Sequence, residues 1–189
     1  LAELLALDLP PARIEAFDIS NTGSDNIVAS MVVYSGTRPL KSAYRRFRIK
    51  ELDGHPDDYA SMQEVLRLRL QRAADGDEKF LPLPDVFLID GGETHARAAL
   101  AVAQEFGCMV PIFGMVKDDR HRTRALVTPE GREIGLVGNQ AVFLIDKDTL
   151  KAKNGSDVDL KELFPPESYV EDWQYYMEKS KGLQNEAKE

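Results

Sequence analysis

The chain has 189 residues, enough for one domain with a substantial core and a further segment. With 43% hydrophobic and 30% charged residues, it has the composition of an ordinary soluble globular protein. No apolar run is long enough to span a membrane, and the N-terminal residues lack a signal-peptide pattern. Its single cysteine, Cys108, excludes an internal disulfide framework and a Cys-rich zinc site. We therefore expect a cytoplasmic protein with no membrane partner.

The net charge of −8 argues weakly against a nucleic-acid partner, but the basic residues are clustered. The range 38–50 contains six basic residues and no acid: Arg38, Lys41, Arg45, Arg46, Arg48 and Lys50. A second basic stretch covers 117–124 and includes Lys117, Arg120, His121, Arg122 and Arg124. Taken alone, either stretch is as readily a solvated strand edge or loop as a nucleic-acid-binding surface. Together they favour a nucleic-acid-binding surface.

Three strands are predicted in the first fifty residues. Residues 14–20 form an apolar stretch that turn residues end, and 27–34 is β-branched and apolar throughout. The third strand, 43–50, alternates between two kinds of side chain. We expect one side of it to form a cationic outer face, made of Tyr44, Arg46, Arg48 and Lys50.

The pattern then changes to alternating helices and strands. Capping residues at 56–58 precede a helical apolar spacing at Tyr59, Met62, Leu66, Leu70 and Ala73. A strand at 85–90, a helix at about 93–106, a strand at 109–116 and a hairpin at 124–127 and 133–136 follow. Three antiparallel strands followed by a βαβ unit are typical of the RNase H-like α/β fold: a mixed sheet with flanking helices.

The character of the sequence changes near residue 141. All thirteen arginines lie at or before Arg132, whereas 146–189 holds seven lysines and eleven acids. We therefore divide the chain into a domain at 13–145 and a distinct acidic, lysine-rich segment at 146–189, either a docked element or a tail.

Two aspartates are candidates for chemistry because each belongs to an apolar strand. Asp18 lies within the first strand and Asp90 ends the central one. A carboxylate in such a place is costly unless it is paired, hydrogen-bonded or bound to a metal. If the two strands are neighbours, the carboxylates meet at one sheet end and can share Mg²⁺ or Mn²⁺, which prefer oxygen ligands. Taken singly, each aspartate is as readily a turn former or a helix cap.

Other polar candidates are less specific. Gly91-Gly92 before a helix permits close approach of a phosphate, although such a pair is usually just a tight turn. Of the three histidines, His121 has the most basic neighbours, whereas His55 and His95 are more simply surface residues. Lys117 ends a strand beside this cluster and is suited to neutralising a phosphate oxygen.

At these residues the sequence resembles the endonuclease domain of the UvrC family, a component of the excinuclease that acts in DNA repair. The similar stretches occur in family order within about 13–140, and they are IEAFDISN (14–21), VASMVVY (28–34), YRRFRIK (44–50), DDYASMQEVL (57–66), LIDGG (88–92), KDDRHRTR (117–124) and TPEGREI (128–134). The resemblance implies an RNase H-like, Mg²⁺- or Mn²⁺-dependent nuclease that cuts damaged duplex DNA 5′ to a lesion, together with UvrA and UvrB.

The resemblance also assigns roles and shows departures. It implies that Asp18 and Asp90 are catalytic carboxylates and metal ligands, and that the stretches around 44–50 and 117–124 lie near the site. The family motif continues Asp-Gly-Gly with Lys-Gly-Gln, whereas 93–95 is Glu-Thr-His here. The paired arginines that the family has directly after Glu-Val-Leu are separated here by Leu68, which lies between Arg67 and Arg69. The family's third catalytic residue, a histidine expected just after 139–141, has no counterpart, since no histidine follows His121.

Two functions remain open at this point. The first is a metal-dependent DNA endonuclease of nucleotide excision repair. The second is a catalytically impaired RNase H-like module that binds DNA or protein, which the absent histidine favours. A small-molecule enzyme with Gly91-Gly92 as a phosphate loop is a weaker third alternative, because no fuller phosphate-binding motif is present.

Overall fold

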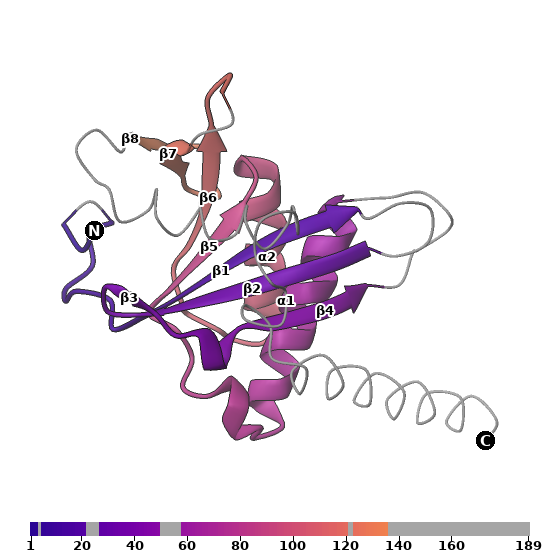
Figure 1. Ribbon diagram of the computed structural model, residues 1–189. Coiled ribbons are helices and arrows are strands. Elements are labelled where there is room, and N and C mark those ends of the chain that lie inside the picture. The colour runs from indigo at the N-terminus through magenta and orange to yellow at the C-terminus, as the bar shows by residue number, and fades with distance from the viewer. Residues whose placement is uncertain (4, 22–26, 50–57, 121–122, 136–189) are drawn as a thin grey trace.

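A mixed β-sheet forms the centre of the structure (Figure 1), a computed structural model that describes residues 1–3, 5–21, 27–49, 58–120 and 123–135. Within these residues the sheet has eight strands in the order β3-β2-β1-β5-β6-β7-β8, and β4 also pairs with β2. The strands are β1 (Arg13–Asn21), β2 (Ile27–Ser35), β3 (Arg38–Pro39), β4 (Arg45–Ile49), β5 (Val86–Asp90), β6 (Ile112–Lys117), β7 (Thr123–Val127) and β8 (Glu133–Gly135). The helices are α1 (Asp58–Ala74) and α2 (Glu93–Glu105), with 3₁₀ turns η1 (Lys41–Ala43) and η2 (Glu78–Phe80).

The pairing of the strands confirms the predicted fold class. β1 is antiparallel to β2 and parallel to β5, and β5 is parallel to β6 across the helix α2. The predicted third strand is shorter than expected, because η1 interrupts the chain before β4. The short β3 and the longer β4 pair with different parts of β2. The proposed boundary near 145 and the whole segment 146–189 lie outside the described residues.

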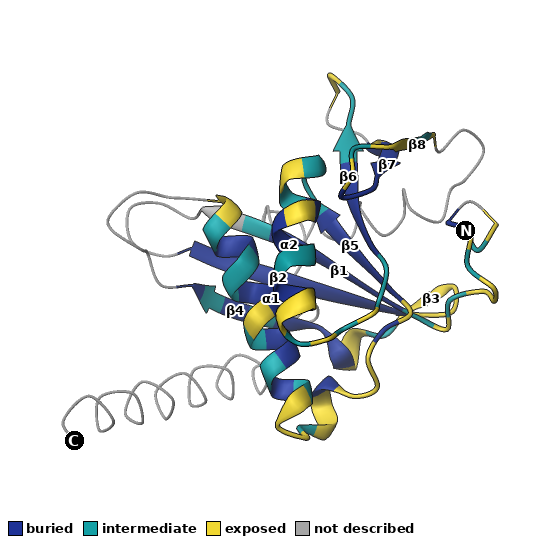
Figure 2. Cartoon of the chain, turned by 180° about the vertical axis from the view of Figure 1, so that it is seen from behind, coloured by how far each residue is buried: buried dark blue, intermediate teal, exposed yellow. Residues whose placement is uncertain are grey.

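Both helices cover one face of the sheet (Figures 1 and 2), with their buried sides turned towards it. Met62, Leu66 and Leu70 of α1 are buried as the helical spacing predicts, whereas Tyr59 is exposed. Ala96, Ala99 and Ala103 form the buried side of α2, and these small residues allow the helix to lie close to the sheet. No helix in the part of the chain that is described has the length and apolar character of a membrane span.

Alternation along β1 assigns its side chains to the two faces. Glu15 contacts Arg69 of α1, so Glu15 and Phe17 face the helices, whereas Ala16 and Asp18 face the opposite side. Asp18 is paired with Ser30 of β2, and Ser30 is paired in turn with Arg46 of β4. Directly paired residues project from the same face of a sheet. Asp18 and Arg46 therefore share the face that α1 and α2 leave uncovered.

A buried ion pair joins the sheet to α1. Arg69 donates to Glu15 at 2.6 Å from Nε and 2.8 Å from a terminal nitrogen, and both side chains are wholly buried. Arg13 donates to the same carboxylate at 3.0 Å. The guanidinium of Arg69 also lies 5.5 Å from the centre of the Phe80 ring, a cation–π distance. Buried charge here is compensated by hydrogen bonds and an aromatic ring.

The hairpin of β7 and β8 is joined by an exposed ion pair. Arg124 donates both terminal nitrogens to Glu133, at 2.8 and 2.9 Å. The hydrogen bond from Arg124 lowers the pKa of Glu133, and the hydrogen bond to Glu133 raises the pKa of Arg124. Water screens this pair, so it contributes little to the stability of the whole fold.

Candidate active site

A pocket of about 310 Å³ opens where β1, β5 and β6 end. Its wall also includes the first residue of α1 and the first turn of α2. The lining residues are Asp18, Ile19, Asp58, Asp90, Gly91, Gly92, His95, Met115, Val116 and Lys117. Strand ends and helix beginnings thus place acids, a base and an imidazole around one cavity.

The two predicted aspartates meet in this pocket. β1 and β5 run parallel with Phe17 beside Ile89, so the register, continued by one residue, places Asp18 beside Asp90. Only 2% of Asp18 is exposed, and 13% of the Asp90 side chain. Adjacent parallel strands lie about 4.8 Å apart. Two carboxylates so close and so poorly hydrated repel each other, and this arrangement favours a bound cation.

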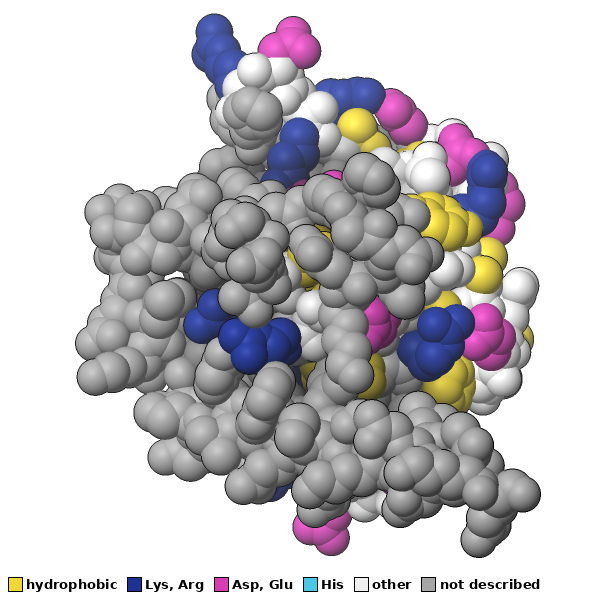
Figure 3. Space-filling view, turned by 90° about the vertical axis from the view of Figure 1, so that its right-hand side faces the viewer, with side chains coloured by type: hydrophobic (Ala, Val, Ile, Leu, Met, Phe, Trp, Pro, Cys, Tyr) yellow, Lys and Arg dark blue, Asp and Glu magenta, His cyan; other side chains and the backbone are white. Residues whose placement is uncertain are grey.

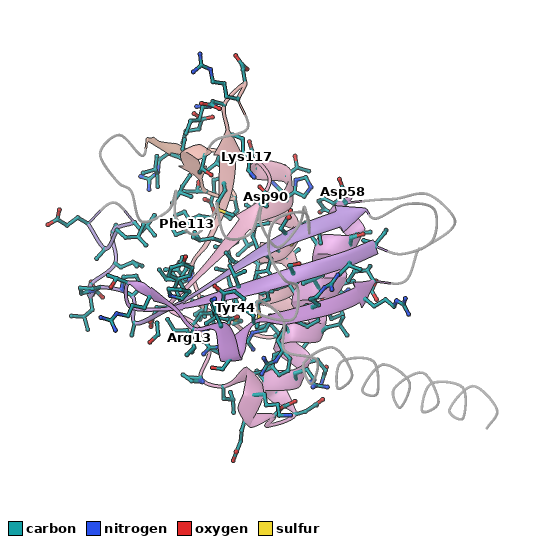
Figure 4. All side chains as sticks on the ribbon, viewed as in Figure 1. Arg13, Tyr44, Asp58, Asp90, Phe113 and Lys117 are labelled. Carbon is teal, nitrogen blue, oxygen red and sulfur yellow. The ribbon has the colours of Figure 1, made fainter. Side chains whose placement is uncertain are left out.

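Lys117 provides a positive charge beside Asp90. Its Nζ lies 2.8 Å from Oδ1 of Asp90, and both side chains are mostly buried. Figure 4 shows the two residues together at the same end of β5 and β6, with Asp58 across from them. Asp90 is paired with Met115, so the side chain of Lys117 reaches back from two residues further along β6. The lysine therefore neutralises part of the carboxylate charge in the pocket.

Close packing explains the glycines beside Asp90. Gly91 has φ of +136°, and a Cβ there would lie 2.6 Å from Cγ of His95. A Cβ on Gly114 of β6 would lie 2.6 Å from the carbonyl oxygen of Gly91. Real Cβ contacts are essentially never that short, so larger residues at either position would displace the loop. The tight turn is thus required by contacts within the chain, and it brings the imidazole of His95 against the residue that follows Asp90.

Sequence reasoning missed two residues of the pocket wall. The sequence predicts a capping role for Asp58, and the residue does begin α1, but it also lines the pocket. The sequence predicts a surface histidine at His95, yet the residue is half-buried and lines the pocket. The available signal for His95 was its departure from the family motif directly after Asp-Gly-Gly. No local pattern identified Asp58, because its position depends on where α1 begins relative to the end of β1.

The structure places the predicted nucleic-acid-binding residues in different environments. Arg46 and Arg48 of β4 are partly exposed on the face that Asp18 shares, and Arg120 is exposed beyond β6. Tyr44 is wholly buried, which corrects its assignment to a cationic outer face. The residue precedes β4 and follows η1, so the strand alternation does not extend to it. Figure 4 shows it far along the sheet from Asp90. His121 and Arg122 lie outside the described residues.

The side of the molecule at which β1 and β4 end has mixed charge. Figure 3 shows Lys and Arg side chains close to Asp and Glu side chains among the described atoms there. A negative chain can still present local basic groups to a phosphate backbone, because electrostatic recognition depends on the distribution of charge as well as on its sum.

The oxygen donors in the pocket suit a hard divalent cation. Mg²⁺ and Mn²⁺ commonly use one or two carboxylates, with waters and substrate phosphates completing the coordination. Asp18 and Asp90 are such a pair of carboxylates. Among the described residues, no group of three or more His, Cys, Asp or Glu side chains is arranged to hold a metal.

Comparisons with known proteins identify the family of the chain. The family model for the UvrC RNAse H endonuclease domain matches residues 2–158. UvrABC system protein C of Ruminiclostridium cellulolyticum is 52% identical over 149 residues, covering 76% of this chain and 24% of that protein. The same protein of Acetivibrio thermocellus is 52% identical over 151 residues, covering 72% of this chain and 24% of that protein.

A distant likeness in fold extends to Ciona intestinalis endonuclease V, with a TM-score of 0.43 and 20% identity over 77% of this chain and 57% of that one. The chain spans about a quarter of the length of the curated relatives that it matches. From the family model and the identity to these relatives, we conclude that the chain belongs to the UvrC RNase H endonuclease domain family.

Proposed function

We propose that this chain is a divalent-metal-dependent DNA endonuclease domain of nucleotide excision repair, which incises damaged duplex DNA 5′ to the lesion. The observation that supports it is the convergence of Asp18 and Asp90 in one pocket, in a family named for its endonuclease activity. The relatives are UvrABC system proteins, so UvrA and UvrB are the proposed partners and the cytoplasm the proposed location.

In the proposed site, Asp18 and Asp90 hold Mg²⁺ or Mn²⁺. A divalent ion there polarises the phosphodiester and helps to generate hydroxide for in-line attack. Lys117 lies close enough to Asp90 to contact a phosphate oxygen that enters the pocket. Arg46 lies two strands from Asp18 on the same face, about 10 Å away at ordinary strand spacing, and Arg48 follows two residues further along β4. Both can contact the DNA backbone. Arg120 is a further backbone contact. His121 and Arg122 remain predicted contacts from the sequence alone.

The second candidate function is a catalytically impaired module that binds DNA or protein. The observation in its favour is the absence of a histidine after His121, where the family resemblance places its third catalytic residue. On this alternative the chain binds DNA but does not cut it. A nicking assay therefore separates the two functions.

The first experiment measures Mn²⁺-dependent nicking of a lesion-containing duplex, with and without UvrA and UvrB, by wild type and Asp18→Asn. The amide weakens metal binding, and loss of metal stabilisation amounts to several kcal/mol, so we expect the rate to fall by about 100-fold or more. The melting temperature should stay close to that of wild type, because the substitution removes a buried charge and keeps the shape.

Asp75→Asn is the matched control. Asp75 is exposed just beyond the end of α1, opposite the end at which Asp58 lines the pocket. The 17 residues of α1 separate the two ends by about 25 Å. We expect this variant to cut at the wild-type rate. Equal rates for Asp18→Asn and Asp75→Asn would refute the endonuclease site, and binding without any nicking by wild type would favour the impaired module.

A further inference from the structure

His95 lines the same pocket as Asp18 and Asp90, although the family resemblance places a glutamine at its position. It is the third residue of α2, so it lies in the first turn of a helix that begins directly after the loop Gly91-Gly92. The side chain is half-buried, which distinguishes it from a solvated surface histidine. The imidazole therefore belongs to the wall of the cavity.

The ring of His95 packs against Gly91. A Cβ on Gly91 would meet Cγ of His95 at 2.6 Å and Nδ1 at 2.7 Å. The ring thus occupies the space that any other residue would fill at 91. Gly114 fixes the loop from the other side, since a Cβ there would meet the carbonyl oxygens of Gly91 and Gly92 at 2.6 and 2.8 Å. An imidazole packed so closely is positioned before a substrate enters.

We propose that His95 contacts the substrate directly, donating a hydrogen bond from its imidazole to a non-bridging oxygen of the phosphodiester that enters the pocket. This inference rests on the proposed function, because it names a further residue of the same site. A donor fixed in advance beside the reacting phosphate stabilises the charge that develops there. It also supplies an imidazole in a chain that has no histidine after His121. His95 is then a catalytic residue, and Gly91 is a positioning residue that acts through it.

The first test compares wild type with His95→Ala and His95→Gln in the Mn²⁺-dependent nicking assay. Loss of a preorganised donor lowers kcat by about 100-fold in well-studied sites, so we expect a fall of about 10- to 100-fold for His95→Ala with little change in KM. The glutamine amide also donates an N–H at a similar reach, and we expect His95→Gln to stay within about fivefold of wild type. A purely structural role predicts no such rescue and no selective loss of kcat. Wild-type kinetics for His95→Ala would overturn the inference.

The second test perturbs the ring through Gly91. Gly91→Ala adds a methyl group where the imidazole lies, at a φ that also strains the backbone. Gly107→Ala is the control: its φ is +62°, so it is strained too, but its Cβ would meet nothing within 4 Å, and it lies beyond the opposite end of α2. Both variants should lose some stability. Per folded molecule, Gly91→Ala should lose activity as His95→Ala does, whereas Gly107→Ala should retain it; equal activities would overturn the positioning role of Gly91.

The third test does not depend on turnover. The chain has three histidines, so a proton NMR spectrum of the ring protons identifies the signal of His95 by comparison with His95→Gln. We titrate a short lesion-containing duplex in Ca²⁺, which replaces the catalytic ion. The His95 signal should shift with DNA and Ca²⁺ and not with Ca²⁺ alone. If wild type does not cut, the proposed function fails, and a shift of this signal still supports the contact. A signal that DNA leaves unchanged overturns the contact, whether or not the protein cuts.

Discussion

At the scale of single residues, the ion pair between Lys117 and Asp90 bears directly on the proposed binding of a divalent ion. The two groups are 2.8 Å apart and mostly buried, so in the proposed metal site the lysine would compete with the divalent ion for the same carboxylate. A buried aspartate beside a lysine is a stable arrangement by itself. In the proposed metal site, a divalent ion would therefore have to displace this ammonium or share Asp90 with it.

This competition predicts an opposite effect of Lys117→Met on two measurements. Removing the ammonium should tighten Mn²⁺ binding by roughly three- to tenfold, equivalent to about 1 kcal/mol, because the carboxylate charge is no longer partly neutralised. The nicking rate should fall, because a cation that can contact the phosphate is lost. Isothermal titration calorimetry measures the first effect and the nicking assay the second.

Lys79→Met is the control for Lys117→Met. Lys79 is exposed in η2, near the end of α1 that lies away from the pocket. The control removes the same charge from the chain and should leave both Mn²⁺ affinity and nicking unchanged. An unchanged Mn²⁺ affinity in Lys117→Met would contradict the competition between the lysine and the metal for Asp90.

At the scale of elements, β4 carries the arginines that share a face with Asp18. A phosphate contact contributes a slope of about 0.9 to the dependence of log affinity on log salt. The double variant Arg46→Ala/Arg48→Ala should therefore reduce the salt slope of DNA binding by about 1.8, with a uniform loss of affinity across sequences. Fluorescence anisotropy at several salt concentrations measures both quantities.

The matched control for β4 is Arg67→Ala/Lys79→Ala. These two residues lie in α1 and η2, in the layer on the opposite face of the sheet. Their double substitution removes the same net charge as the double variant of β4. If the two double variants have equal salt slopes, the effect comes from overall charge, and β4 is not the DNA-binding element.

How far the sequence predicts these elements depends on the range of the interactions that form them. β1, β2, β5, α1 and α2 follow from local apolar patterns and turn residues, and each was predicted within a few residues. The third strand was predicted less well. The chain turns at η1 before β4, which breaks the alternation that assigned Tyr44 to the outer face. Where a 3₁₀ turn interrupts a strand is decided by packing against β2, and local alternation contains no signal for it.

The candidate site was also predicted only in part, and again the residues found were those with a local signal. Asp18 and Asp90 were recognised because a charged residue in an apolar strand is locally unusual. Asp58 and His95 were not, since each lies at the beginning of a helix, where polar residues are ordinary. Their approach to the aspartates follows from the direction in which α1 and α2 leave the sheet. That direction is a property of the packed molecule.

At the scale of the whole molecule, a buried ion pair that the sequence pattern does not predict joins the sheet to the layer of helices. Arg69 belongs to α1 and Glu15 to β1, and both side chains are wholly buried. Their residue types are normally exposed, so residue type alone would place Arg69 towards solvent, although its spacing from Met62 and Leu66 puts it on the buried side of α1. Two hydrogen bonds from Arg69 and one from Arg13 satisfy the carboxylate. The arrangement fixes the position of α1 on the sheet, and hence the position of Asp58 at its beginning.

Glu15→Gln should consequently destabilise the fold by about 3–5 kcal/mol, because it leaves the guanidinium of Arg69 buried without a carboxylate. Glu105→Gln breaks the exposed pair with Arg67, whose side chains are about half-exposed, and should cost less than about 1 kcal/mol. Urea unfolding measures the free energy of unfolding of both variants.

A loss of about 3–5 kcal/mol is a large part of the total stability of a domain, so the single variant is compared with Glu15→Leu/Arg69→Met. This double variant removes both charges and keeps apolar volume, and it should be more stable than Glu15→Gln. If Glu15→Gln were no more destabilising than Glu105→Gln, the buried pair would not hold the two layers together.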